Sequence, residues 1–191
     1  MKSIGSVTVL SQQTHLSVVL LILALGVAMT AAVLLLRRSG KAPQLCRLLP
    51  RIVLAAYLAA FLWLTLAGRR SLIDENLKME FLWSYREAFS LEGGFRVVRL
   101  GIARQILLNI LVMIPLGYML PLVLENARHP LRWTALCGFA LSLLVELLQY
   151  VMHLGYLELD DLFNNTLGCL IGIGIFILLK WGIGRIPIRE T

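Results

Sequence analysis

The chain has 191 residues, of which 59% are hydrophobic and 15% are charged, and its mean hydropathy is +0.81. A soluble domain of ordinary composition has about 45–50% apolar and about 25% charged residues, so a sizeable soluble domain is excluded. The net charge of +7 lies beside the apolar segments, where anionic lipid headgroups are its natural partners. A nucleic-acid partner is not expected, because no soluble unit remains to carry a basic face.

The apolar residues form blocks long enough to cross a bilayer, which takes about 20 residues of helix. The sequence therefore predicts an all-α fold, a polytopic membrane helix bundle that forms a single membrane domain over residues 1–191. Five transmembrane helices are expected at about residues 15–36, 52–67, 105–124, 133–153 and 162–181. Pro115 falls inside the third span and should kink it, because proline removes one backbone hydrogen bond.

Residues 69–104 form the one long connection, with five acidic and seven basic residues. Its polarity is too mixed for a span, and its aromatic residues are of the type found at headgroup level. We therefore expect an amphipathic interfacial segment, with Gly93 and Gly94 as a break before the next helix.

The distribution of bases predicts the orientation. Ten bases fall on the side of the two short connectors and the C-terminal tail, against eight on the other side. Bases in short connectors count most, and the acidic turn from Glu158 to Asp161 falls on the other side. The sequence thus predicts an N-terminus outside the cell and a C-terminus in the cytoplasm.

Polar residues interrupt three of the predicted spans at the same depth. Glu146, Gln149 and His153 follow each other at spacings of three and four along the fourth span, which places them on one helical face. Asp161, Asn164 and Asn165 open the fifth span. Asn109 lies just over one turn into the third. An ionisable side chain at membrane depth costs about 2.5–3.5 kcal/mol on insertion scales, so Glu146 in particular predicts a functional site.

Simpler roles compete with this interpretation. Asp160 or Asp161 can cap the fifth helix, and Asn109 and Gln149 can form ordinary interhelical hydrogen bonds. Gly168 and Gly172 have the spacing that lets two membrane helices approach closely. The three cysteines show no CxxC spacing, and we expect no metal and no cofactor.

The motifs NILVMIPLGYMLP, E-x-x-Q and ELDDLFNNTLGCLIG, in this order, resemble the VanZ-like family of small bacterial membrane proteins. The resemblance covers about residues 76–178. The positions that match the family's signature are Asn109, Pro115, Gly117, Glu146, Gln149, Asp161, Asn165, Thr166, Gly168 and Gly172. Two features depart from it: Glu80 stands where a proline is expected, and no base lies between His153 and Lys180.

The resemblance implies action on the cell envelope at the outer leaflet, lowering susceptibility to teicoplanin-type glycopeptides. It implies as partners membrane lipids and a lipid-linked cell-wall precursor or a glycopeptide. Asn109, Gln149, His153 and Asn165 would bind the substrate. Two alternatives stay open: a membrane-embedded enzyme with Glu146 and Asp161 as catalytic carboxylates, and a transport or scaffold partner without catalysis. The oligomeric state is not predicted.

Overall fold

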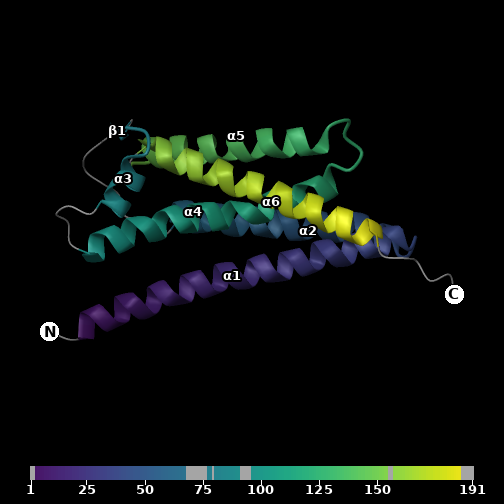
Figure 1. The fold of residues 1–191 in the computed structure, drawn as a ribbon, viewed down its shortest axis with the longest axis horizontal. Helices are drawn as coiled ribbons and strands as arrows, with labels where there is room; N and C mark the ends of the chain where they lie inside the picture. Colours follow the sequence, from purple (N-terminus) through teal and green to yellow (C-terminus); the bar gives the residue numbers. More distant parts are fainter. Residues whose placement is uncertain (1–2, 68–76, 79, 91–95, 155–156, 186–191) are drawn as a thin grey trace.

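The computed structural model describes residues 3–67, 77–78, 80–90, 96–154 and 157–185. In these ranges the long helices lie side by side along one axis (Figure 1). α1 begins at one end of the bundle, and α6 ends at the other. The elements in chain order are α1 (Ser3–Arg38), α2 (Pro43–Leu62), the π-helical turn η1 (Trp63–Ala67), β1 (Leu77–Lys78), α3 (Trp83–Phe89), α4 (Arg96–Val123), α5 (Pro130–Val151), β2 (Leu157–Glu158) and α6 (Leu159–Arg185).

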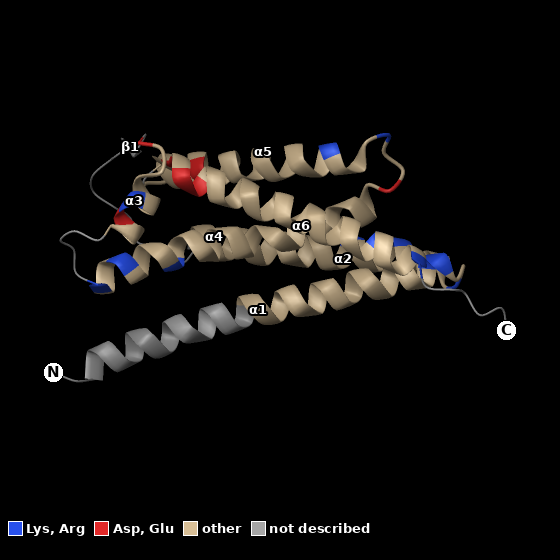
Figure 2. Cartoon of the chain, in the orientation of Figure 1, with Lys and Arg blue, Asp and Glu red and all other residues tan. Residues whose placement is uncertain are grey.

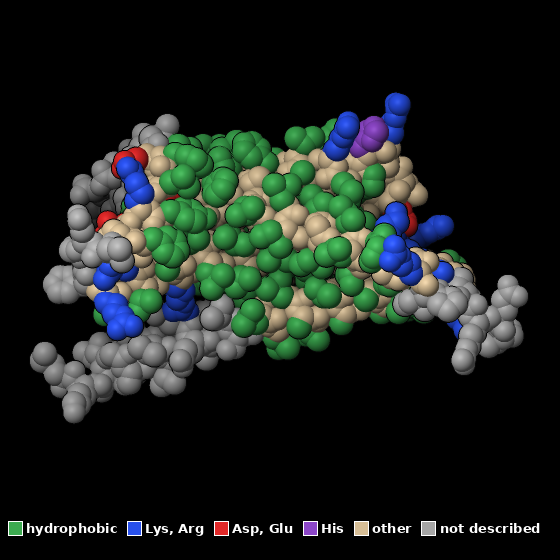
Figure 3. Space-filling view, viewed as in Figure 1, with side chains coloured by type: hydrophobic (Ala, Val, Ile, Leu, Met, Phe, Trp, Pro, Cys, Tyr) green, Lys and Arg blue, Asp and Glu red, His purple; other side chains and the backbone are tan. Residues whose placement is uncertain are grey.

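Within the described ranges, five helical stretches are long and apolar enough to cross a membrane. Large apolar side chains such as Leu25 and Leu178 are exposed on the outside of the bundle, where lipid would solvate them (Figure 3). The predicted all-α membrane helix bundle is therefore confirmed. The five stretches are Val19–Arg38, Pro43–Leu66, Arg96–Val123, Pro130–Val151 and Leu159–Arg185.

Several helices extend beyond the predicted spans. α4 begins at Arg96 rather than at Gln105, and α6 continues past Trp181 to Arg185. A helix satisfies its own backbone hydrogen bonds in water as well as in lipid. Apolar content therefore marks where the chain crosses the membrane, and it does not mark where the helix ends.

The predicted interfacial segment is described only in part, and Gly93 and Gly94 lie outside the described residues. Its described centre is α3, and the aromatic side chains of Phe81, just before this helix, and of Phe89, its last residue, are exposed. The segment is tied to the bundle by β1, which pairs in parallel with β2 just before α6 begins. The described part of the connection between the second and third spans thus lies against the start of the last helix.

α4 lies at the centre of the bundle and packs most extensively against α6. A Cβ atom on Gly168 would lie 2.1 Å from the carbonyl oxygen of Ile110, and one on Gly172 would lie 2.1 Å from that of Ile114. Only glycine leaves room for this approach of the two backbones. The predicted packing role of Gly168 and Gly172 is confirmed. Because both residue numbers rise together along the contact, α4 and α6 run parallel.

Candidate functional site

Nine of the eleven buried polar or charged side chains that the structure describes lie at one end of the bundle, around the start of α6. Figure 2 shows acidic residues, coloured red on the ribbon, gathered at this end. We call these nine residues the polar cluster: Ser84, Ser142, Glu146, Gln149, Glu158, Asp160, Asp161, Asn164 and Asn165. Of the predicted site residues, it contains Glu146, Gln149, Asp161 and Asn165.

Glu146 lies on α5, next to the connection that leads into α6, and its side chain is only 3% exposed. Its Oε2 atom accepts a hydrogen bond from the backbone N–H of Glu158 at 3.2 Å. Glu158 directly precedes α6, so the charge of Glu146 lies near the positive end of that helix dipole. Glu146 therefore faces the protein interior and holds the α5–α6 connection.

Asp160 lies in the first turn of α6, but its carboxylate caps a different helix. Oδ1 accepts from the N–H of Leu82 at 2.6 Å, and Oδ2 accepts from the N–H and the hydroxyl of Ser84 at 2.9 and 2.5 Å. Leu82 and Ser84 stand at the start of α3, where backbone N–H groups have no partner within the helix. Of the two aspartates considered as caps of the fifth helix, Asp160 does not fill that role, because both of its carboxylate oxygens accept hydrogen bonds from the N-terminus of α3.

A second set of contacts joins α3 to α6. The hydroxyl of Tyr85 donates to Oδ1 of Asn164 at 2.5 Å. The ring of Phe163 meets the rings of Phe81 and Tyr85 edge-on, with centroid distances of 5.6 and 6.4 Å. Burial raises the pKa of Tyr85 above its ordinary value of 10.0, and the nearby charge of Asp160 raises it further.

Two polar contacts link α6 to its long neighbours. Nδ2 of Asn165 donates to the hydroxyl oxygen of Ser142, on α5, at 3.0 Å. The carboxylate oxygens of Asp161 lie 3.4 and 3.5 Å from Nε2 of Gln105, on α4, which is long for a hydrogen bond. These contacts bring side chains from the third, fourth and fifth spans to one depth, as the sequence predicts.

Asn109 lies on α4 at the level of Asn165. Ile110 on α4 packs against Gly168 on α6, and the two helices run parallel. Asn109 lies one residue before Ile110, and Asn165 lies three residues before Gly168, so both side chains lie at nearly the same depth. Asn109 is partly exposed, but its Nδ2 atom is buried. The packing of α4 against α6 thus places Asn109 at the depth that the sequence predicts.

Gln149 joins the cluster to the end of the second span. Its Nε2 atom donates to the carbonyl oxygen of Thr65 at 3.1 Å, and Thr65 belongs to the π-helical turn η1. π-Helical turns within helices occur frequently at functional sites. The bond is the interhelical hydrogen bond predicted for Gln149 as its simpler role.

Four carboxamide atoms in and beside the polar cluster are buried and have no hydrogen-bond partner in the described part of the chain. A buried polar atom left without a partner costs about 1–3 kcal/mol. Two of the four atoms are donors and two are acceptors, so a bound molecule that carries both kinds of group can satisfy them. They are Nδ2 of Asn109, Oε1 of Gln149, Nδ2 of Asn164 and Oδ1 of Asn165.

His153 does not lie on the helical face of Glu146. α5 ends at Val151, and His153 adopts a left-handed backbone conformation with φ of 54°. Its side chain is exposed. The predicted shared face is therefore wrong, because the helix ends before it reaches His153.

The sequence does not predict that α3 and η1 contribute residues to the candidate site. Ser84, Tyr85 and Thr65 approach the polar cluster only because the segments that carry them fold back onto α5 and α6. Their spacing along the chain gives no signal of this. Among the described residues, no group of three or more His, Cys, Asp or Glu side chains is arranged to hold a metal ion.

Comparisons with known proteins agree with this architecture. The sequence profile of the VanZ/LLP1 family matches residues 51–180, which include α4, α5 and most of α6. Protein VanZ of Enterococcus faecium is 24% identical over 134 residues, which cover 68% of this chain and 74% of that protein. No solved structure matches the chain significantly. The chain is an integral membrane protein that belongs to the VanZ/LLP1 family.

Proposed function

We propose that this membrane protein binds the headgroup of a lipid-linked cell-wall precursor in the outer leaflet, and that the binding lowers susceptibility to teicoplanin-type glycopeptides. The association with teicoplanin belongs to the VanZ-like family, and the E. faecium relative carries the VanZ name. We extend this association to the chain and assign the binding to the polar cluster and Asn109.

The observation that carries the proposal is the set of four buried carboxamide atoms without partners. A precursor headgroup built of sugars and a peptide presents hydroxyl and amide donors together with carbonyl acceptors. Such a headgroup offers donors for the carboxamide oxygens of Gln149 and Asn165 and acceptors for the carboxamide nitrogens of Asn109 and Asn164. Glu146 and Asp161 then supply negative charge that orients the donors of the ligand.

An apolar hollow beside the polar cluster suits the hydrocarbon chain of such a precursor. It has a volume of about 260 Å³ and lies between α5, α6 and the residues before α3. Leu159 and Leu162, on either side of the two aspartates, contribute to its wall, so the apolar hollow and the polar cluster adjoin. Its lining is Phe81, Phe139, Leu159, Leu162, Phe163 and Thr166.

The proposed orientation puts the polar cluster outside the cell. At the opposite end of the bundle, the described charged residues are almost all basic (Figure 2). They include one acid, Glu125, which pairs with Arg37. Bases near the ends of spans stay in the cytoplasm, and this supports an N-terminus outside the cell and a C-terminus in the cytoplasm. The bases at this end are Arg37, Arg38, Lys41, Arg47, Arg51, Arg128, Arg132, Lys180 and Arg185.

The experiment compares teicoplanin susceptibility in a host that lacks the protein. The host expresses the wild-type chain, Glu146→Gln, Asp161→Asn or the control Thr30→Val. Thr30 is fully buried on α1, and its hydroxyl oxygen has no partner in the described structure, so the control removes a similar atom far from the polar cluster. We expect both carboxylate variants to lose protection at normal membrane abundance, and the control to keep it. Full protection by both carboxylate variants would refute the proposed site.

The same strains separate binding from catalysis. If the protein only binds the precursor, the chemical composition of the precursor pool is unchanged by the wild-type chain. A new lipid product that disappears in Glu146→Gln would instead assign catalysis to the carboxylates. Mass spectrometry of extracted lipids distinguishes the two results.

A further inference from the structure

The end of the bundle opposite the polar cluster holds a cavity of about 800 Å³. It lies between the end of α1, the α4–α5 connection and the end of α6. Five of its lining residues are basic or imidazole side chains: Arg37, Arg128, His129, Arg132 and Lys180. Figure 3 shows Lys, Arg and His side chains gathered at this end of the molecule.

One of these bases is already neutralised within the protein. Arg37 pairs with Glu125 at 2.6 Å and donates to the carbonyl oxygens of Cys46 and Leu122 at 2.9 and 3.1 Å. These bonds fix Arg37 and Glu125 as part of the wall. With four cationic residues and one carboxylate in the lining, the cavity keeps a net charge of +3 when His129 is neutral.

The remaining three cations are uncommitted. Arg128, Arg132 and Lys180 are exposed, and none of them forms a hydrogen bond or an ion pair with any residue that the structure describes. Arginine and lysine are the side chains that proteins use for phosphate groups. Three such side chains around one cavity favour an anionic ligand.

The cavity also has an apolar wall that faces the lipid. Leu131, Phe176 and Ile177 line it, and Ile177 is 46% exposed on the outside of α6. Trp181 completes the lining and stacks against the guanidinium of Arg185 at 3.5 Å. Tryptophan and arginine near the end of a span mark the level of the lipid headgroups. The cavity thus joins headgroup depth to hydrocarbon depth.

We propose that this cavity is a binding site for an anionic phospholipid. Its phosphate contacts Arg128, Arg132 and Lys180, and an acyl chain lies along Phe176 and Ile177. Basic pockets between transmembrane helices suit anionic headgroups. Free phosphate shares the same charge chemistry, but it makes no use of the apolar wall, so a lipid fits the whole lining. The site does not depend on the polar cluster or on the function proposed for it.

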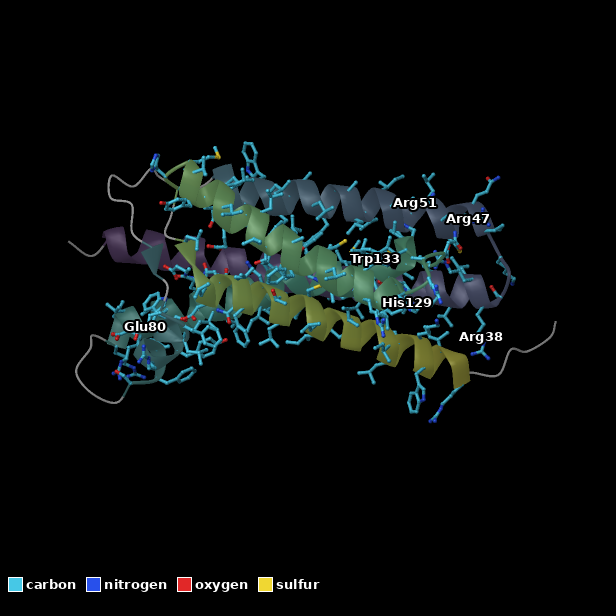
Figure 4. All side chains as sticks on the ribbon, turned by 90° about the horizontal axis from the view of Figure 1, so that it is seen from above. Arg38, Arg47, Arg51, Glu80, His129 and Trp133 are labelled. Carbon is cyan, nitrogen blue, oxygen red and sulfur yellow. The ribbon has the colours of Figure 1, made fainter. Side chains whose placement is uncertain are left out.

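The test uses native mass spectrometry of the full chain, purified in detergent and mixed with phosphatidylglycerol or phosphatidylcholine. The cavity variant combines Arg128→Gln, Arg132→Gln and Lys180→Gln. The matched control combines Lys41→Gln, Arg47→Gln and Arg51→Gln, which removes the same charge from exposed bases at the same end that do not line the cavity. Figure 4 shows Arg47 and Arg51 along α2, apart from His129 at the cavity.

The wild-type chain is expected to retain phosphatidylglycerol about tenfold more tightly than phosphatidylcholine, and the cavity variant is expected to lose this preference. The control should keep it, and Ile177→Ser should weaken retention with the charges intact. An equal loss in the control, or an unchanged preference in the cavity variant, would overturn the site. Displacement of the lipid by excess inorganic phosphate would show that the anion alone is the ligand, and would overturn the lipid assignment.

Discussion

The carboxylate of Asp160, on α6, accepts hydrogen bonds from both the backbone N–H and the hydroxyl of Ser84, on α3, which lies 76 residues earlier in the chain. An isolated helix as short as α3 is not stable by itself. Its position therefore depends on this carboxylate and on the neighbouring contacts of Tyr85 with Asn164 and Phe163. These contacts fix an interfacial helix over the polar cluster.

Removing this carboxylate should release α3. Asp160→Ala leaves the N–H groups of Leu82 and Ser84 without their acceptor, and a hydrogen bond to a charged group contributes about 1.5–3 kcal/mol. We expect faster hydrogen exchange in α3 and a lower thermal unfolding temperature. Asp160→Asn keeps one acceptor and should have a smaller effect. Equal exchange in the wild-type chain and in Asp160→Ala would contradict the capping role.

The contact between Tyr85 and Asn164 should weaken at high pH. The pKa of Tyr85 is raised in the folded protein, so its neutral form is favoured there. The stability that Tyr85 contributes is therefore fully present below pH 10.0, the pKa of tyrosine in the unfolded chain. This contribution is lost as the pH rises through the higher pKa of Tyr85 in the folded protein. Subtracting the spectroscopic titration of Tyr85→Phe from that of the wild-type chain separates Tyr85 from the other four tyrosines, and the difference should be a single ionisation above pH 10.0. A difference that ionises at or below pH 10.0 would show that the pKa of Tyr85 is not raised.

The approach of α4 to α6 should tolerate no added methyl group. A Cβ on Gly117 would lie 2.1 Å from the carbonyl oxygen of Cys169, and the one on Gly168 meets the backbone of Ile110 equally closely. Gly117→Ala and Gly168→Ala must separate the helices and should lower the yield of folded protein strongly. Gly174 lies on α6 like Gly168, but a Cβ atom added there would have no atom within 4 Å, so Gly174→Ala serves as the control. Similar yields of all three variants, measured by gel filtration in detergent, would disprove this packing.

The orientation can be read by labelling single cysteines. The exposed thiol of Cys137 is first replaced by alanine. Glu87→Cys, on α3, should then react with an impermeant thiol reagent on intact cells, whereas Arg128→Cys, in the α4–α5 connection, should react only after lysis. Both side chains are exposed in the structure, so burial does not protect either position. The reverse pattern would invert the proposed topology.

Much of the bundle could be predicted from the sequence, because crossing a bilayer requires long apolar blocks. Alternating spans also put the end of the fourth and the starts of the third and fifth on one side, which brings Glu146, Gln149, Asp161 and Asn165 together. The contact of Asp160 with α3 could not be predicted, since it joins distant segments through a connection without helical periodicity. The position of His153 depends on where α5 ends, and the spacing of Glu146, Gln149 and His153 along the sequence does not show this.

If the polar cluster and Asn109 bind a precursor headgroup, the purified chain has a measurable affinity for a lipid-linked cell-wall precursor, and this affinity depends on the buried carboxamides. Gln149→Met and Asn165→Leu remove the buried carboxamides while keeping the size of the side chains, and Thr30→Val is the control. Losing a hydrogen bond of 1–2 kcal/mol lowers affinity by roughly tenfold, so we expect each cluster variant to bind about tenfold more weakly and the control to bind like the wild-type chain. Equal affinity of all four proteins for the precursor would show that the buried carboxamides of the polar cluster do not bind it.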